Sequence, residues 1–152
     1  MTTHKSAAVT AGIMPDFAQA GVVLCRSGFI YTADDEIVSG DTIQMVPIPE
    51  GALVLQVQVY HCALPANTTG CDIGYGGDPD AFAATVTMTA ADWKVFPGNS
   101  LEGNPGFRHI FTADDTVDIT FGTLDTKLPT ASALQLNVWY KMTGVLADED
   151  DI

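Results

Sequence analysis

The sequence predicts an all-β domain, built as an antiparallel two-sheet sandwich or jelly roll. Two observations predict this class. Apolar and polar residues alternate with a period of two in several stretches, and turn-forming residues separate these stretches at intervals of about 8–12 residues. The pattern also lacks the long helical crossovers that parallel strands need, which favours antiparallel pairing.

The clearest alternation runs from residue 53 to residue 60. One face of this predicted strand carries Leu53, Leu55, Val57 and Val59, and the other carries Gln56 and Gln58. Residues 132–142 repeat the pattern, with Trp139 in the polar, outward set. We therefore expect two long half-buried strands, with these residues together in one core: Leu55, Val57, Leu136 and Val138.

Further strands are predicted at 82–88 and 117–121, each with an apolar face and a polar, solvent-exposed face. On the apolar faces we place Phe82, Ala84, Val86, Met88, Val117, Ile119 and Phe121. Shorter candidates are 22–26, 29–32, 42–46, 71–75 and 108–112. Only residues 89–94 suggest a helical turn, in which Thr89 caps the turn and Asp92 reaches back to it.

The two ends of the chain lack periodicity. Residues 1–20 are rich in Thr and Ala and predict an extended N-terminal arm, and residues 147–152 form an acidic C-terminal tail. The β-sandwich domain is expected over 21–146. Within the arm, three apolar side chains are candidates for binding a partner: Ile13, Met14 and Phe17.

Composition limits the possible partners. The chain of 152 residues carries 19 acidic and 6 basic residues, a formal net charge of −13. Such a charge repels phosphate backbones and anionic headgroups, so neither nucleic acid nor membrane is an expected partner. No apolar stretch approaches the length of a spanning helix. The hydrophobic fraction of 47% predicts a globular domain rather than a disordered chain.

No catalytic motif or cofactor motif is recognisable. The three cysteines, Cys25, Cys62 and Cys71, match no zinc spacing, and the three histidines lie far apart in the sequence. His61 falls on the inward face of its strand, which indicates a structural residue. A glycosidase needs only two carboxylates close in space, so sequence cannot exclude one. We predict a protein that is not an enzyme and needs no cofactor.

One glycine-rich loop is a candidate metal site. Hard carboxylate oxygens at Asp72, Asp78 and Asp80 could bind Ca²⁺, although the spacing is not that of an EF-hand. Asp-Pro and Gly-Gly pairs also form ordinary turns, and this alternative is the stronger one.

Several segments together resemble small virion proteins of tailed bacteriophages, namely capsid decoration (cement) proteins and related head proteins. The segments are Gly40 to Ile43, Ile48 to Ala52, Asp72 to Gly74, Gly77 to Phe82 and Val138 to Tyr140. The resemblance implies a sandwich or jelly roll that sits as a homotrimer on the outer capsid surface and clamps major capsid subunits. It also implies a virion component that assembles in the host cytoplasm, and it transfers no site residue.

A second function fits the same pattern. A carbohydrate-binding or receptor-binding module of a phage tail or fibre would use an outward aromatic residue such as Trp139 as an anchor. Trp93 could serve similarly.

Overall fold

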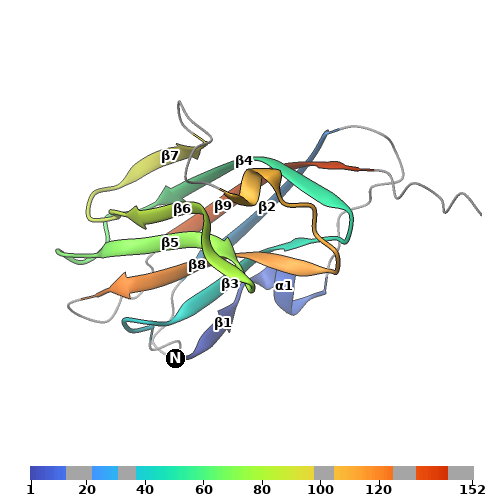
Figure 1. The fold of residues 1–152 in the computed structure, drawn as a ribbon. Helices are drawn as coiled ribbons and strands as arrows, with labels where there is room; N and C mark the ends of the chain where they lie inside the picture. Colours follow the sequence, from blue (N-terminus) through green and yellow to red (C-terminus); the bar gives the residue numbers. More distant parts are fainter. Residues whose placement is uncertain (13–21, 31–36, 98–104, 125–132, 144–152) are drawn as a thin grey trace, which may run out of the picture.

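The computed structural model describes residues 1–12, 22–30, 37–97, 105–124 and 133–143, and in these residues it forms two packed β-sheets (Figure 1). The five-stranded sheet has the order β1-β3-β8-β5-β6, and the four-stranded sheet has the order β2-β9-β4-β7. The first consists of β1 (Thr3–Lys5), β3 (Thr42–Ile48), β8 (Asp115–Thr123), β5 (Thr69–Tyr75) and β6 (Asp78–Val86). The second consists of β2 (Val22–Ile30), β9 (Ala133–Met142), β4 (Ala52–His61) and β7 (Asp92–Phe96).

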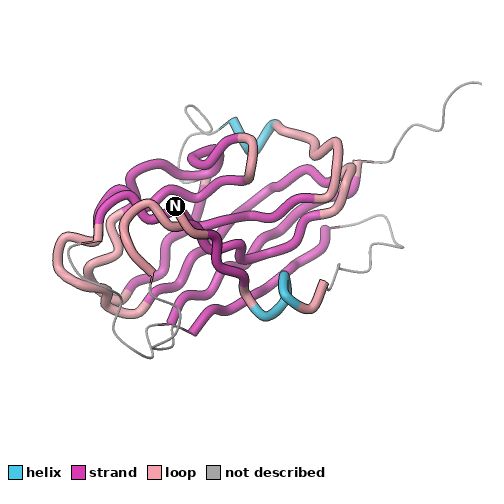
Figure 2. Tube along the Cα trace, turned by 90° about the horizontal axis from the view of Figure 1, so that it is seen from below, coloured by secondary structure: helices cyan, strands magenta, loops and turns pink. Residues whose placement is uncertain are grey.

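All strand pairs are antiparallel except β1 with β3. Two short helical turns accompany the sheets, α1 (Ala7–Thr10) and η1 (Pro105–Arg108), and they lie on opposite sides of the molecule (Figure 2). The predicted all-β two-sheet architecture is confirmed. The predicted strands 22–26 and 29–32 fall in one strand, β2, as far as Ile30, and residues 31–32 lie outside the described residues. The predicted strand 108–112 is absent; this stretch contains the end of η1 and an isolated bridge from Ile110 to Leu53.

The core lies between the sheets. It contains the expected Val57, Leu136 and Val138, each fully buried. The inward side chains of β8 face them from the other sheet, and the largest fully buried side chains include Tyr140, Phe82, Phe121 and Met45. Burial of a large apolar side chain stabilises a fold by about 1.5–3 kcal/mol, so this core accounts for most of the driving force for folding.

Leu55 does not join the core. Its side chain is 40% exposed, whereas Val54 and Val57 are fully buried. The pairing between β4 and β9 shifts register between Val54 and Gln56, so Leu55 is the extra residue of a β-bulge. A bulge changes the face that the following side chains occupy, and strict alternation from Leu53 onward was therefore a wrong prediction.

A second bulge corrects the prediction for Ala84, which is exposed rather than inward. Cys71 pairs with Val86 and Ile73 with Ala83, so two residues of β6 lie opposite Asp72 alone. Thr85 has a φ of 55°, which is unusual for a β-branched residue. The Asp72 carboxylate accepts a 2.8 Å hydrogen bond from the Thr85 N–H and stabilises this conformation.

The helical turn predicted at 89–94 is wrong. Residues 92–96 form the edge strand β7, paired with β4 through Tyr60 and Trp93 among others. Asp92 accepts hydrogen bonds from the Trp93 N–H and from Lys94, and does not cap a helix at Thr89. The sequence contains the capping residues, but cross-strand pairing with β4 outweighs that local preference.

The start of the chain is part of the described fold. β1 pairs in parallel with β3, and Ser6 is buried, with its hydroxyl donating a 2.6 Å hydrogen bond to the Met45 carbonyl oxygen. The Ser6 hydroxyl also caps α1 by accepting from the Val9 N–H. Of the predicted arm, residues 1–12 therefore lie against β3, and 13–20 lie outside the described residues. The acidic tail at 147–152 also lies outside them.

The outer face of β8 is more deeply buried than predicted. Thr116 and Asp118 belong to the expected wet face, yet both are buried. Gly74 of β5 lies opposite Asp118 in the register. A Cβ atom at Gly74 would come within 2.2 Å of the Asp78 carbonyl oxygen. The missing side chain lets the beginning of β6 fold closely over this face.

Candidate interaction surfaces

The outer face of the four-stranded sheet carries aromatic and amide side chains. Side chains that pair across neighbouring strands share a face, so the register identifies the members. Gln56 pairs with Trp139, Gln58 with Asn137 and Val95, and Tyr60 with Gln135 and Trp93. We call this set the aromatic–amide face: Gln56, Gln58, Tyr60, Trp93, Val95, Gln135, Asn137 and Trp139.

The centre of its exposed part is an aromatic pair. The ring centroids of Tyr60 and Trp93 lie 5.2 Å apart, with an angle of 47° between the ring planes. Trp93 is 51% exposed and Val95 is 42% exposed, and they project from the edge strand β7. Exposed aromatic side chains of this kind anchor many protein contacts, because they bury much apolar area with few rotatable bonds.

The other members are four amides, one valine and one tryptophan, and none of the eight is charged. The Gln135 side-chain N–H donates a 3.0 Å hydrogen bond to the Asn137 side-chain oxygen, and Asn137 is buried between its neighbours. Arg26 of β2 also pairs with Asn137 and so shares this face by register, but none of the paired positions is acidic. In a chain with a net charge of −13, a face without acidic residues is one on which an acidic neighbouring molecule is weakly repelled.

The edge strand β7 disfavours addition of a further strand. Its alternate residues Asp92 and Lys94 form an exposed ion pair with an N–O distance of 3.0 Å. Charged side chains on an edge strand are a common protection against strand addition. A partner is therefore expected to contact the aromatic–amide face through side chains rather than to extend the sheet.

Of the residues predicted to bind partners, Ile13, Met14, Phe17 and Trp139, only Trp139 lies among the described residues. Trp139 lies in the outward set of β9, on the aromatic–amide face, but it is half-buried beside Gln56, and Trp93 is the more exposed of the two tryptophans. Ile13, Met14 and Phe17 lie outside the described residues.

The three calcium candidates do not meet. Asp72 is bonded to Thr85 at the bulge of β6, whereas Asp78 and Asp80 lie at the other end of that strand. Burial, followed by the hydrogen bond and the negative charge of Asp80, raises the pKa of Asp78. Within the described parts of the chain, no three His, Cys, Asp or Glu side chains are grouped to hold a metal ion.

The buried histidine and cysteine side chains have structural surroundings. His61 is fully buried; its desolvation lowers the pKa, and its Nδ1 lies 3.1 Å from the Cys62 carbonyl oxygen. Cys71 is a free buried thiol whose pKa burial raises to about 12, which keeps it in the unreactive thiol form. Cys62 is also free, and its sulfur accepts a hydrogen bond from the Ala133 N–H.

Comparison with known proteins shows where this fold occurs. No protein-family model matches the chain, and no curated protein sequence matches it. A chain in the capsid of Ralstonia phage GP4 superposes with a TM-score of 0.76 and 17% identity, over 93% of this chain and 99% of that one. The fold is shared with a phage capsid chain.

Two more phage capsid structures contain similar chains. The match in the cyanophage Pam1 capsid asymmetric unit has a TM-score of 0.52 and 15% identity, over 86% of this chain and 91% of that one. The match in the acidic stable capsid of Helicobacter pylori bacteriophage KHP30 has a TM-score of 0.50 and 16% identity, over 81% of this chain and 89% of that one.

Among the described residues, no helix is both long and apolar enough to cross a membrane.

Sequence reasoning missed Tyr60 and Val95 and ranked Trp93 below Trp139. The signal that joins them is the register between β4 and β7, which places Tyr60 beside Trp93 and Gln58 beside Val95. Reading residues 92–96 as a strand would have placed Trp93 and Val95 on one face by alternation alone.

Proposed function

We propose that this chain is a structural, non-catalytic virion protein that decorates and stabilises the capsid of a tailed bacteriophage by binding major capsid subunits. The observation that carries the proposal is the shared fold with the chain in the Ralstonia phage GP4 capsid, because it extends over nearly the whole of both chains. The two further capsid chains with this fold support the same role.

Charge favours decoration over a shell made of this chain alone. Copies that each carry a net charge of −13 repel one another when they are closely packed over a continuous surface. Attachment of small clusters of copies at separated positions on a different protein limits this repulsion to the copies within each cluster. Acidic character also keeps the chain away from a packaged genome, which suits a position on the outer surface.

Two elements are proposed to make the contacts. The aromatic–amide face contacts the capsid subunit, since it combines exposed aromatic area with the absence of acidic residues. The segment 13–20 contributes the apolar side chains Ile13, Met14 and Phe17, which gain stability by leaving water when they bind. The protein is proposed to assemble as a homotrimer, because closed point-group symmetry is the norm for structural subunits.

Sedimentation with shells tests the proposal. Purified chain is mixed with shells assembled from the major capsid subunit alone, and the pellet is assayed for bound protein. Saturable binding at a fixed number of copies per shell is expected, together with raised thermal stability of the shell. A triple variant with Ser at Ile13, Met14 and Phe17 should bind more weakly. Failure of the wild-type chain to bind at any concentration would refute decoration.

One observation favours a second function, a carbohydrate-binding or receptor-binding module. Aromatic rings beside amide side chains are the groups that contact sugar faces and sugar hydroxyls, and Tyr60, Trp93 and Gln135 combine them on one face. A glycan array separates the two functions: specific glycan binding that is lost in Trp93→Ala, without shell binding, would favour the second.

A further inference from the structure

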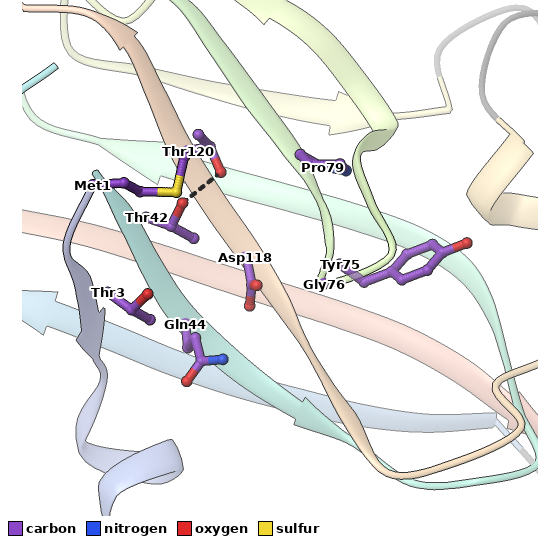
Figure 3. A pocket seen from close by; sticks show the side chains of 9 residues that line it. All are labelled: Met1, Thr3, Thr42, Gln44, Tyr75, Gly76, Pro79, Asp118 and Thr120. Atoms are coloured by element: carbon purple, nitrogen blue, oxygen red, sulfur yellow. Dashed lines mark hydrogen bonds between the residues drawn. The ribbon is translucent and has the colours of Figure 1, made fainter. Parts of the chain in front are cut away.

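A groove on the outer face of the five-stranded sheet contains a buried carboxyl group. It encloses about 230 Å³ and is lined by Met1, Thr3, Thr42, Gln44, Tyr75, Gly76, Pro79, Asp118 and Thr120 (Figure 3). It lies on the opposite sheet from the aromatic–amide face. Asp118 lies at the centre of the view on β8, between Gln44 of β3 and the β5–β6 turn (Figure 3).

Asp118 is the only ionisable side chain in the lining apart from the Tyr75 phenol, whose ring points away from Asp118 (Figure 3). The Asp118 residue is only 6% exposed, yet its Oδ1 atom has no hydrogen-bond partner among the described residues. Desolvation is the main reason that the pKa of Asp118 rises to about 7; Thr116 lowers it and the negative charge of Asp115 raises it further. A buried carboxylate oxygen without a hydrogen-bond partner is costly in its ionised form, so a donor placed in this groove would stabilise the ionised form.

The other lining groups are neutral hydrogen-bonding groups. Thr42 and Thr120 share a 2.9 Å hydrogen bond between their hydroxyls, and each hydroxyl oxygen has further accepting capacity. The Gln44 amide lies across from Asp118 in the register. Met1 and Pro79 add apolar surface at opposite sides (Figure 3). The lining therefore suits a ligand with an alkyl stem and several hydrogen-bond donors.

No cation of the described chain forms an ion pair with this carboxylate. Met1, which carries the α-ammonium group, lines the groove, but it is 97% exposed and does not pair with Asp118. The closest basic residue by register is Lys5, which lies across from Gln44 and so two strands from Asp118. Two strand spacings amount to about 9–10 Å, and Lys5 does not line the groove. A metal ion would need several oxygen ligands, and the groove offers one carboxylate. A cationic side chain has the matching charge, donors and stem.

We propose that this groove receives the cationic end of a lysine or arginine side chain from a partner subunit, with the Asp118 carboxylate as its counter-charge. Three donors of an ammonium group, or five of a guanidinium group, would be shared between Asp118 and the neutral oxygens of the lining. That the cation comes from a capsid subunit rests on the proposed function. The chemistry of the groove is independent of that role.

Titration of the isolated full chain tests the groove directly. The Asp118 carboxyl carbon is followed by NMR against pH in excess ethylguanidinium or n-butylammonium, with tetramethylammonium at the same ionic strength as a control that cannot donate hydrogen bonds. The first two cations should lower the apparent pKa of Asp118, and a fall of about 1 would mean a tenfold preference for the ionised form. An equal effect of tetramethylammonium, or no effect of any cation, would overturn the proposal. So would a larger fall in calcium chloride, which would indicate a metal site.

Two matched variants complete the test. Asp118→Asn should abolish the chemical-shift changes that ethylguanidinium causes at Thr42 and Thr120, whereas Asp92→Asn, an equal charge change on the other sheet, should leave them unchanged. If Asp118→Asn does not fold, the wild-type titration alone decides. In shell sedimentation, Asp118→Asn should bind at least tenfold more weakly than Asp92→Asn. Equal binding of the two variants would refute the proposal that a capsid subunit supplies the cation for this groove. It would not affect the proposal that the chain decorates the capsid.

Discussion

Asp41 accepts a 2.7 Å hydrogen bond from the backbone N–H of Thr2, and this contact fastens the start of the chain to the loop before β3. The same carboxylate accepts a 3.0 Å hydrogen bond from the Val38 N–H and lies 3.5 Å from His4 Nε2. Burial opposes its ionisation, but the bonds from Val38 and Thr2 and the contact with His4 together lower its pKa.

Asp41→Asn should therefore destabilise the domain. A buried carboxylate that loses its charge leaves two backbone donors with weaker acceptors, which costs about 1–3 kcal/mol in the free energy of unfolding. Since the folded pKa lies below the usual 3.8, the contribution is present at neutral pH and is lost as the pH falls through the folded pKa. Urea unfolding at pH 7 and pH 3 measures both effects. Asp92→Asn is the control, and an equally small change in both variants would contradict the assigned role.

Deleting residues 2–6 should lower the melting temperature as well. The deletion removes β1, its pairing with β3 and the buried hydroxyl of Ser6. Replacing Ile13, Met14 and Phe17 by Ser leaves these contacts in place and should alter the melting temperature much less. Differential scanning calorimetry distinguishes the two segments. A deletion without any thermal effect would mean that the first residues do not stabilise the domain.

The pH dependence of stability should carry a signature of Asp118. Its folded pKa of about 7 exceeds the ordinary value of 3.8, so the folded state binds more protons than the unfolded state between these values. Stability must then fall as the pH rises from about 4 to 7, by at most about 4 kcal/mol from this group. Asp118→Asn should remove that slope and raise the melting temperature at pH 8. A variant that keeps the wild-type slope would contradict the assignment.

Gly74→Ala should be far more damaging than Gly76→Ala. A Cβ atom at Gly74 would lie 2.2 Å from the Asp78 carbonyl oxygen, which belongs to backbone and cannot rotate away. At Gly76 the closest atom is the Asp115 side chain at 3.5 Å. Overpacking of this kind costs about 1–3 kcal/mol or more. Denaturant unfolding of both variants checks this, and equal stability would refute the close approach of β6 to β5.

Val95→Glu should weaken shell binding, and Val38→Glu should not. The two valines are exposed to almost the same extent, 42% and 43%, but only Val95 belongs to the aromatic–amide face. A negative charge at Val95 must lose its hydration when a partner covers that face, and this is costly without an opposite charge. Sedimentation with shells compares the variants. Equal binding of both would remove the aromatic–amide face from the proposed contact.

The sequence was informative wherever a strand kept a strict alternation. Val57, Leu136 and Val138 were placed correctly because the residues around each of them alternate in polarity and the bulge of β4 lies before Val57, at Leu55. Leu55 and Ala84 were misplaced because a bulge depends on the partner strand, which local sequence does not encode. Bulges therefore limit how far alternation can be extended along a strand.

The candidate surfaces were less predictable than the fold. Trp93 lay in a segment with helix-capping residues, so its pairing with Tyr60 was hidden. The sequence pattern placed Asp118 on a solvent-exposed face. Its burial results from Gly74 and Pro79, which lie about forty residues earlier in the chain, so local sequence does not reveal it. Groups that acquire their environment from distant segments can be located only in the folded structure.

Electron cryomicroscopy of the phage particle tests the central claim most directly. The proposed function predicts density of this two-sheet fold on the outer surface of the capsid, in clusters of three, with each copy contacting major capsid subunits. The aromatic–amide face should lie within that contact. Density of this fold only in the tail or fibres, or as a continuous shell made of this chain alone, would contradict the decoration role.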